Sequence, residues 1–303
     1  MSLIRNEIFA EFENYNPISK KAISESQILK DFHTIAWEIN SNCNYNCSYC
    51  INPANKTDNK RTRSVDEILQ AFERTKKRWI ICFTGGEPFL FPDYINLISE
   101  LSEKHIIDIN TNLSTDNIYA LPQIKNPSSI IGLYASYHVV EREKNHGVND
   151  FIDKVLFLQE QKLHTIVSYL AHPLLLDRIE SDFDFLLGKG IKNLAPKKFI
   201  GNYKGKLYPE SYSAENIEMF KRLKNCFELD IIDFDQHTAG RKCFAGKKYF
   251  FMNKYGDLFR CASDLKPHGN FFEGNIKYNF MVKKCTANKC GCPFEGVLSS
   301  KAK

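Results

Sequence analysis

Three cysteines within eight residues constrain this chain more than any other feature of its sequence. Cys43, Cys47 and Cys50 are separated by three and then by two residues. A short loop can turn all three sulfurs towards one centre, and thiolates clustered in this way favour zinc or an iron–sulfur cluster. A structural zinc ion or an ordinary ferredoxin cubane takes four protein ligands. Three cysteines would therefore leave one iron of a cubane with an open position.

The residues that follow predict a second ligand-binding turn. An apolar run at 35–40 indicates a strand that delivers the cysteine loop. Ser64 and Glu67 have the spacing of a capping box and predict the start of a helix. A buried strand at 78–83 then runs into a Gly-Gly-Glu-Pro turn at residues 85–88. Two glycines allow the backbone to approach a ligand closely, and Glu87 can accept hydrogen bonds from a cation.

Strands and helices alternate along the rest of the first 200 residues, in units of about 30 residues. This order predicts an α/β fold with a parallel sheet that curls into a partial (β/α)6 TIM-like barrel. Barrels of this kind place their chemistry at the C-terminal ends of the strands. The expected strands span residues 35–40, 78–83, 106–110, 129–136, 163–170 and 191–199, and the expected helices begin near residues 64, 92, 149 and 179.

Polar residues follow several of these strands and could contact a ligand or could only shape the turns. They are Asn110 and Asn112 after the third strand, and Ser136 after the fourth. The segment 198–209 is basic and aromatic, and it could bind an anionic or sugar-like substrate or serve as a solvated connector.

The cysteine spacing, with the aromatic residue Tyr49 before the third cysteine, resembles the radical S-adenosylmethionine (radical SAM) family. The Gly-Gly-Glu-Pro turn follows in the order that this family shows. The resemblance implies that Cys43, Cys47 and Cys50 hold a [4Fe-4S] cluster whose open iron chelates SAM. It also implies reductive cleavage of SAM to a 5′-deoxyadenosyl radical. A zinc knuckle or redox cysteines are the alternatives.

The resemblance implies roles for the remaining groups at the strand ends. Gly85, Gly86 and Glu87 match the turn that binds the SAM amino group. Asn110, Asn112 and Ser136 are expected to contact SAM or substrate. An electron donor such as flavodoxin or ferredoxin is the expected protein partner.

A second group of cysteines lies beyond residue 240, at positions Cys243, Cys261, Cys285, Cys290 and Cys292. A predicted β-hairpin brings Cys243 and Cys261 together at its open end. Cys243, Gly256 and Cys261 resemble the SPASM and twitch subdomains of radical SAM enzymes, which implies an auxiliary [4Fe-4S] cluster. Five cysteines rather than about seven favour the one-cluster twitch form, with one of the last three thiols spare. A zinc ribbon is the alternative.

Composition excludes several other classes of protein. The net charge of +5 is diffuse and does not indicate nucleic-acid binding. No apolar run is long enough for a membrane span, and the first residues do not form a signal peptide. We therefore expect a cytoplasmic protein without a membrane partner. We expect three parts: an N-terminal extension (1–32), the barrel (33–209) and the auxiliary-cluster subdomain (210–303).

These observations predict a radical SAM oxidoreductase that acts on a polar small molecule, such as an alcohol or a sugar. The auxiliary cluster would accept an electron from the substrate radical. Modification of a ribosomal peptide, by epimerisation or cross-linking, is the second hypothesis. A non-enzymatic module that binds zinc in both cysteine groups is the third.

Overall fold

The computed structural model describes most of the barrel and parts of the C-terminal region. The described residues are 32–50, 63–223, 239–240, 242–243, 245–277 and 282–285. The predicted N-terminal extension (except residue 32) lies outside them, as do the residues that follow the cysteine loop (51–62), residues 224–238 and the predicted ligands Cys290 and Cys292. No helix among the described residues has the length and apolar character needed to cross a bilayer.

Six parallel strands form the centre of the fold and confirm the predicted partial barrel. They pair in sequence order, each with the next. Their bounds are β1 His33–Asn40, β2 Trp79–Gly85, β3 Ile106–Thr111, β4 Ile130–Tyr137, β5 Thr165–Ala171 and β6 Leu194–Lys198. Because all six run the same way, the loops that follow them gather at one end of the barrel.

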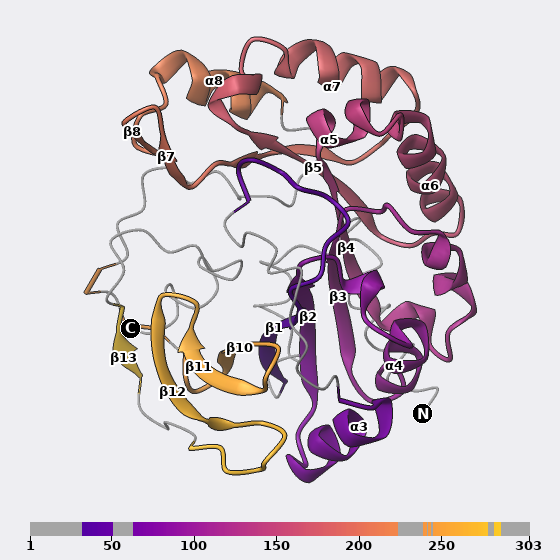
Figure 1. Cartoon of the computed structure of the whole chain (residues 1–303), viewed down its shortest axis with the longest axis vertical. Helices are drawn as coiled ribbons and strands as arrows, with labels where there is room; N and C mark the ends of the chain where they lie inside the picture. Colours follow the sequence, from indigo (N-terminus) through magenta and orange to yellow (C-terminus); the bar gives the residue numbers. More distant parts are fainter. Residues whose placement is uncertain are drawn as a thin grey trace.

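Helices cover the outer, convex side of this curved sheet (Figure 1). They are α3 Val65–Arg74, α4 Tyr94–Leu101, α5 Val139–Lys144, α6 Val148–Glu160, α7 Ile179–Gly188 and α8 Ala214–Leu223, with 3-10 turns η2 Pro88–Leu90, η3 Asp116–Gln123, η4 Pro127–Ser129 and η5 Pro173–Leu175. The predicted capping box is present: Ser64 and Glu67 each accept a hydrogen bond from the other's backbone N–H. Helix α3 buries Ile68, Ala71 and Phe72, and a fully buried large apolar side chain contributes about 1.5–3 kcal/mol.

The C-terminal strands continue the same sheet beyond β1. Strand β10 (Tyr249–Met252) pairs in parallel with β1, and β11 (Asp257–Cys261) and β12 (Asp264–Asn270) follow in antiparallel order. The predicted hairpin of β10 and β11 is therefore confirmed. Strand β12 was not expected, because Pro267 interrupts its pattern. Proline is tolerated there since β12 is the edge of the nine-stranded sheet.

The segment expected as a loop at 198–209 contains a small hairpin instead. Strands β7 (Gly201–Tyr203) and β8 (Lys206–Tyr208) pair in antiparallel order. Lys204 and Gly205 between them both have positive φ angles, of 49° and 79°. Two such residues in a two-residue turn match the right-handed twist of a hairpin.

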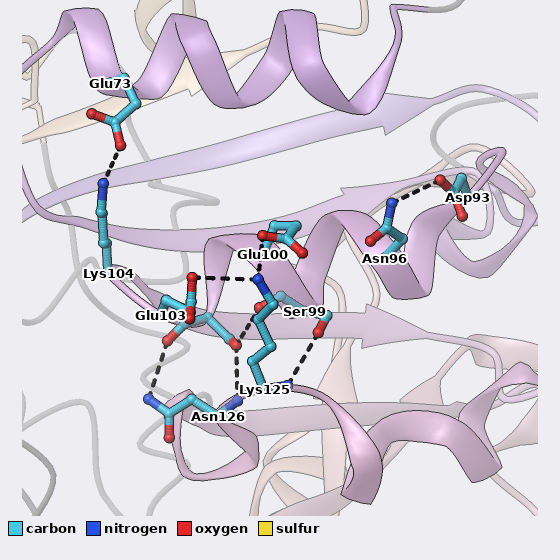
Figure 2. A network of polar contacts seen from close by, with 10 residues as sticks. Glu73, Asp93, Asn96, Ser99, Glu100, Glu103, Lys104, Lys125 and Asn126 are labelled. Atoms are coloured by element: carbon cyan, nitrogen blue, oxygen red, sulfur yellow. Dashed lines mark hydrogen bonds and ion pairs between the residues drawn. The ribbon is translucent and has the colours of Figure 1, made fainter. Parts of the chain in front are cut away.

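A polar network joins helices α3 and α4 to the segments that lead into β3 and β4 (Figure 2). Lys125 Nζ lies 2.6 Å from Glu100 of α4, and Lys104 pairs with Glu73 of α3. Asn126 donates through its backbone N–H to Ser102 Oγ over 3.1 Å. The charged groups are largely exposed, so water and salt screen these ion pairs and they contribute little to stability. The network links α3, α4 and the segment before β4 at the surface.

Candidate functional site

The cysteine loop is anchored to the turn after β2 by backbone hydrogen bonds. The N–H of Gly86 donates to the carbonyl of Asn40 over 2.9 Å, and that of Glu87 donates to Asn42 over 2.7 Å. The Asn40 side chain returns a hydrogen bond to the Glu87 carbonyl at 3.0 Å. The two segments that the sequence singled out are therefore one structural unit.

Glycine is required at both positions of this unit. A Cβ on Gly86 would lie 2.1 Å from the carbonyl oxygen of Asn42, and one on Gly85 would lie 2.3 Å from that of Asn40. Gly85 also has a φ of 131°, which disfavours any other residue. The two glycines therefore make room for the backbone of residues 40–42, which lead into the cysteine loop. The sequence analysis had attributed this room to a ligand.

The carboxylate of Glu87 is buried, with 1% exposure. It accepts hydrogen bonds from Phe89 N at 3.1 Å, Thr111 Oγ1 at 2.7 Å and Asn112 N at 2.6 Å. Burial raises its pKa to about 7, and these hydrogen bonds oppose the shift. The side chain therefore joins the end of β2 to the end of β3, and the contact of Glu87 with the SAM amino group stays a prediction.

Asn112 reaches from the end of β3 to the first cysteine. Its Nδ2 lies 3.8 Å from Cys43 Sγ and 3.1 Å from Asn44 Oδ1. Ser114 and Asn44 also exchange hydrogen bonds, at 2.8 and 3.0 Å. An amide N–H directed at a cysteine sulfur stabilises negative charge there. Asn112 therefore lies next to a cysteine of the predicted cluster. Its predicted contact with SAM stays a prediction.

Two buried charged residues on α5 hold the cysteine loop from the other side, and the sequence analysis did not identify them. Glu141 accepts a hydrogen bond from Asn46 N over 3.3 Å. The Arg142 guanidinium lies 5.6 Å from the centre of the Tyr45 ring and donates to the Asn112 carbonyl. Burial lowers the Arg142 pKa to about 10. Glu141 and Arg142 lie within six residues of the predicted strand end at Ser136. This position is the sequence feature that could have drawn attention to the two residues.

Aromatic rings close the loop against the ends of β4 and β5. The ring of Tyr49 stacks on that of His138 with centroids 5.9 Å apart, and lies 5.3 Å from His172. The Tyr49 hydroxyl is 3.2 Å from His138 Nδ1. Burial lowers the His138 pKa to about 3, so this imidazole is neutral at physiological pH. His172 also contacts Tyr203 of the β7–β8 hairpin, at 4.8 Å.

The remaining predicted residues occupy the same end of the barrel. Asn110 Nδ2 lies 3.4 Å from the carbonyl of Phe83, so it bridges β3 to β2. Ser136 Oγ lies 3.4 Å from Ser168 Oγ on β5. Both predicted side chains are half-buried, whereas Ser168 is buried. Whether either binds SAM stays a prediction.

The three thiols fit the donor set of an iron–sulfur cluster. Burial raises the pKa of Cys43 and raises that of Cys47 to about 12, and the charges of neighbouring cysteines act in the same direction. Such thiols lose their protons to a metal rather than to water at neutral pH. No three Cys, His, Asp or Glu side chains in the described part of the chain already stand at metal-binding spacing. The thiols are therefore neighbours on one loop, and a bound cluster would set their final spacing.

The described cysteines of the second group lie on two sheets: Cys261 on the extended main sheet, and Cys243 and Cys285 on or next to a separate two-stranded sheet. Cys261 ends β11, and Cys243 lies in β9 (Lys242–Cys243), which pairs with β13 (Lys283–Lys284). Cys285 follows β13, and its backbone carbonyl accepts a hydrogen bond from Gly240 N over 2.9 Å. The turn between β10 and β11 approaches the first site, because Lys254 donates to Ser41 Oγ over 2.7 Å. The hairpin turn therefore contacts the residues before the cysteine loop, a contact that the sequence did not predict, while Cys261 lies at the other end of β11.

The fold and this site define a class of protein. Residues 37–125 match the family described as the Radical SAM superfamily. These residues hold the cysteine loop, the Gly-Gly-Glu turn and the end of β3. This segment of the chain therefore matches a radical SAM superfamily domain, and that family implies a [4Fe-4S] cluster and SAM as its cofactors.

Curated relatives match this chain over different lengths. An uncharacterized protein of Methanocaldococcus jannaschii is 24% identical over 279 residues, which cover 84% of this chain and 92% of that protein. The 7-carboxy-7-deazaguanine synthase of Methanothermobacter thermautotrophicus is 33% identical over 78 residues, which cover 24% of this chain and 32% of that enzyme.

Solved structures share the fold. SuiB of Streptococcus suis bound to S-adenosylmethionine has a TM-score of 0.57 at 15% identity, over 90% of this chain and 77% of that one. The anSMEcpe structure with bound AdoMet has a TM-score of 0.58 at 15% identity, over 83% of this chain and 84% of that one. At this identity the likeness concerns the fold.

Proposed function

We propose that the protein is a radical SAM enzyme that abstracts a hydrogen atom from a polar small molecule and oxidises it. The observation that carries the proposal is the single unit formed by the cysteine loop, the Gly-Gly-Glu turn and the end of β3. A [4Fe-4S] cluster with SAM at its open iron supplies one-electron cleavage of the sulfonium to a 5′-deoxyadenosyl radical. Cys43, Cys47 and Cys50 would hold this cluster.

The chain's own residues position and shield that chemistry. Gly85 and Gly86 let the cysteine loop lie directly on β2, so the thiols keep a fixed relation to the strand ends. Asn112 directs its amide at Cys43. The neutral rings of Tyr49, His138 and His172 form an aromatic wall beside the loop, which would limit the access of water to a radical.

Net oxidation of the substrate needs a second electron acceptor close to the first site. The C-terminal cysteines are the candidates, because strand β11, which ends at Cys261, belongs to the same sheet as β1, the strand that leads into the cysteine loop. An auxiliary [4Fe-4S] cluster of the twitch form there would take one electron from the substrate radical. A small electron-transfer protein such as flavodoxin or ferredoxin would supply the electron for SAM cleavage.

The experiment is anaerobic reconstitution followed by SAM turnover with a strong reductant. We expect about eight irons per chain, as two cubanes require, and formation of 5′-deoxyadenosine. The triple variant C43A/C47A/C50A should form none, and C82A, which alters a buried β2 cysteine outside the site, should retain activity. Turnover by the triple variant would refute the proposal, as would zinc in place of iron, which indicates a zinc-binding module.

Peptide modification is the second candidate. Two structures with this fold are described as bound to peptides: SuiB to the precursor peptide SuiA, and anSMEcpe to the peptide Cp18Cys. Around the strand ends of this chain, Leu174, Ile200 and Leu207 are exposed, at 59%, 46% and 58%, and could contact an extended peptide. A small-molecule product with two fewer hydrogens, formed with one 5′-deoxyadenosine per turnover, supports the first proposal. A peptide product, either epimerised without net oxidation or cross-linked with the loss of two hydrogens, supports the alternative.

A further inference from the structure

One buried arginine touches the chain within two residues of three C-terminal cysteines. Arg260 is 2% exposed and directly precedes Cys261. Its Nε donates to the carbonyl of Ala245 over 3.1 Å, and its Nη2 donates to the carbonyl of Lys283 over 3.0 Å. Ala245 lies two residues after Cys243, and Lys283 lies two residues before Cys285. The guanidinium therefore joins the three segments that carry these thiols.

The strand register brings two of these thiols to one face. Lys283 pairs with Cys243, so Cys285 lies diagonally across the ladder from Cys243, and such neighbours are about 7–8 Å apart. The Ala245 N–H also lies 3.4 Å from Cys243 Sγ. The residue whose carbonyl Arg260 holds is thus the one that donates to the sulfur.

The local backbone is shaped to admit the arginine. Gly246 has a φ of 84°, and a Cβ there would lie 3.1 Å from Arg260 Cγ. On the other side, the pairing of β11 with β12 shifts by one residue between Phe259 and Cys261. Such a shift changes the direction of the side chains that follow. The turn at Gly246 therefore leaves space for the Arg260 side chain, and the shift in strand register occurs at Arg260 itself.

The charge of Arg260 also suits a thiolate site. The carboxylate paired with it among the described residues is that of Asp264, at a long 3.9 Å. A buried cation held mainly by carbonyl groups is costly unless negative charge lies nearby. An iron–sulfur cluster with cysteine thiolates carries net negative charge, and nearby positive charge raises its reduction potential.

We propose that Arg260 is the positioning residue that assembles Cys243, Cys261 and Cys285 around an auxiliary iron–sulfur cluster and raises the reduction potential of that cluster. This inference rests on the auxiliary cluster of the proposed function. A higher potential favours acceptance of an electron from a substrate radical.

The test isolates the auxiliary cluster in the full chain that carries C43A/C47A/C50A. We expect about four irons per chain in this parent. Adding Arg260→Met should accelerate iron loss to a chelator at least fivefold and lower the midpoint potential of the remaining cluster. Arg260→Lys keeps the charge but cannot bridge two carbonyls, so it should restore the potential without restoring resistance to the chelator.

The matched control is Arg222→Met on α8, where the arginine is 64% exposed and pairs with Glu180. It should change neither measurement. The inference is overturned if Arg260→Met leaves both unchanged, or if the parent binds zinc or no metal. SAM cleavage by the unmodified chain is a separate measurement. Cleavage without a second cluster would overturn the inference and leave radical SAM activity standing.

Discussion

The contact between Gly86 and Asn42 gives the sharpest test of how the site is built. In Gly86→Ala the new Cβ would start 2.1 Å from the Asn42 carbonyl oxygen, which must retreat by about 0.9 Å to reach the 3.0 Å of real contacts. The obstacle is backbone, so no side-chain rotation relieves it. Overpacking of this kind costs about 1–3 kcal/mol. Weakening the Glu87 N–H bond to Asn42 adds about 1 kcal/mol.

We therefore expect Gly86→Ala to lower the free energy of unfolding by about 2–4 kcal/mol, out of the 5–15 kcal/mol typical of a protein. The cysteine loop should also be displaced from the turn after β2, so the amount of iron that binds at Cys43, Cys47 and Cys50 on reconstitution should fall. Denaturant unfolding and iron analysis measure the two effects. Gly188→Ala is the control, because nothing lies within 4 Å of its new Cβ at the end of α7; it should be neutral or slightly stabilising. Equal stability and iron content in the two variants would refute the reasoning.

Three further outcomes follow from the same geometry. Asn112→Ala removes the amide directed at Cys43, so the midpoint potential of the first cluster should fall in a redox titration; an unchanged potential contradicts this. Glu141→Ala removes the acceptor of Asn46 N and should speed loss of the first cluster several-fold, as followed by absorbance, whereas Glu141→Gln should largely restore it. The raised pKa of Glu87, about 7 against an ordinary 4.5, means that the folded state holds a proton that the unfolded state releases. The stabilisation of the folded state by protonated Glu87 should therefore be complete below pH 4.5. As the pH rises through 7, the free energy of unfolding should fall by up to about 3 kcal/mol. Unfolding at pH 5 and pH 8 should show this loss relative to Glu87→Gln, and equal pH profiles would exclude it.

The order of elements could be predicted because each depends on local pattern. Buried runs such as 78–83 bounded the strands closely, and the Ser64 capping box placed the start of α3 correctly. The alternation of strand and helix then fixed a parallel sheet and its functional end. The cysteine loop and the Gly-Gly-Glu turn could be predicted to lie together, because each follows one of two neighbouring parallel strands.

What the sequence did not show depends on contacts between distant segments. Glu141 and Arg142 look like solvated charges on a short helix, and only their packing against the cysteine loop buries them. The parallel pairing of β10 with β1 joins residues more than 200 positions apart, which no local pattern reveals. The β7–β8 hairpin has Lys-Gly at its turn, a weaker signal than Asn-Gly.

The seam between β10 and β1 has a consequence for synthesis on the ribosome. Strand β1 emerges early and pairs with β2, but its other edge finds its partner only when residues near 250 have left the exit tunnel. Until then the nascent polypeptide presents an open row of backbone donors and acceptors beside the cysteine loop, and such edges recruit other chains. The iron–sulfur cluster predicted at that loop would therefore be inserted beside a strand edge that stays open until residues near 250 have been translated.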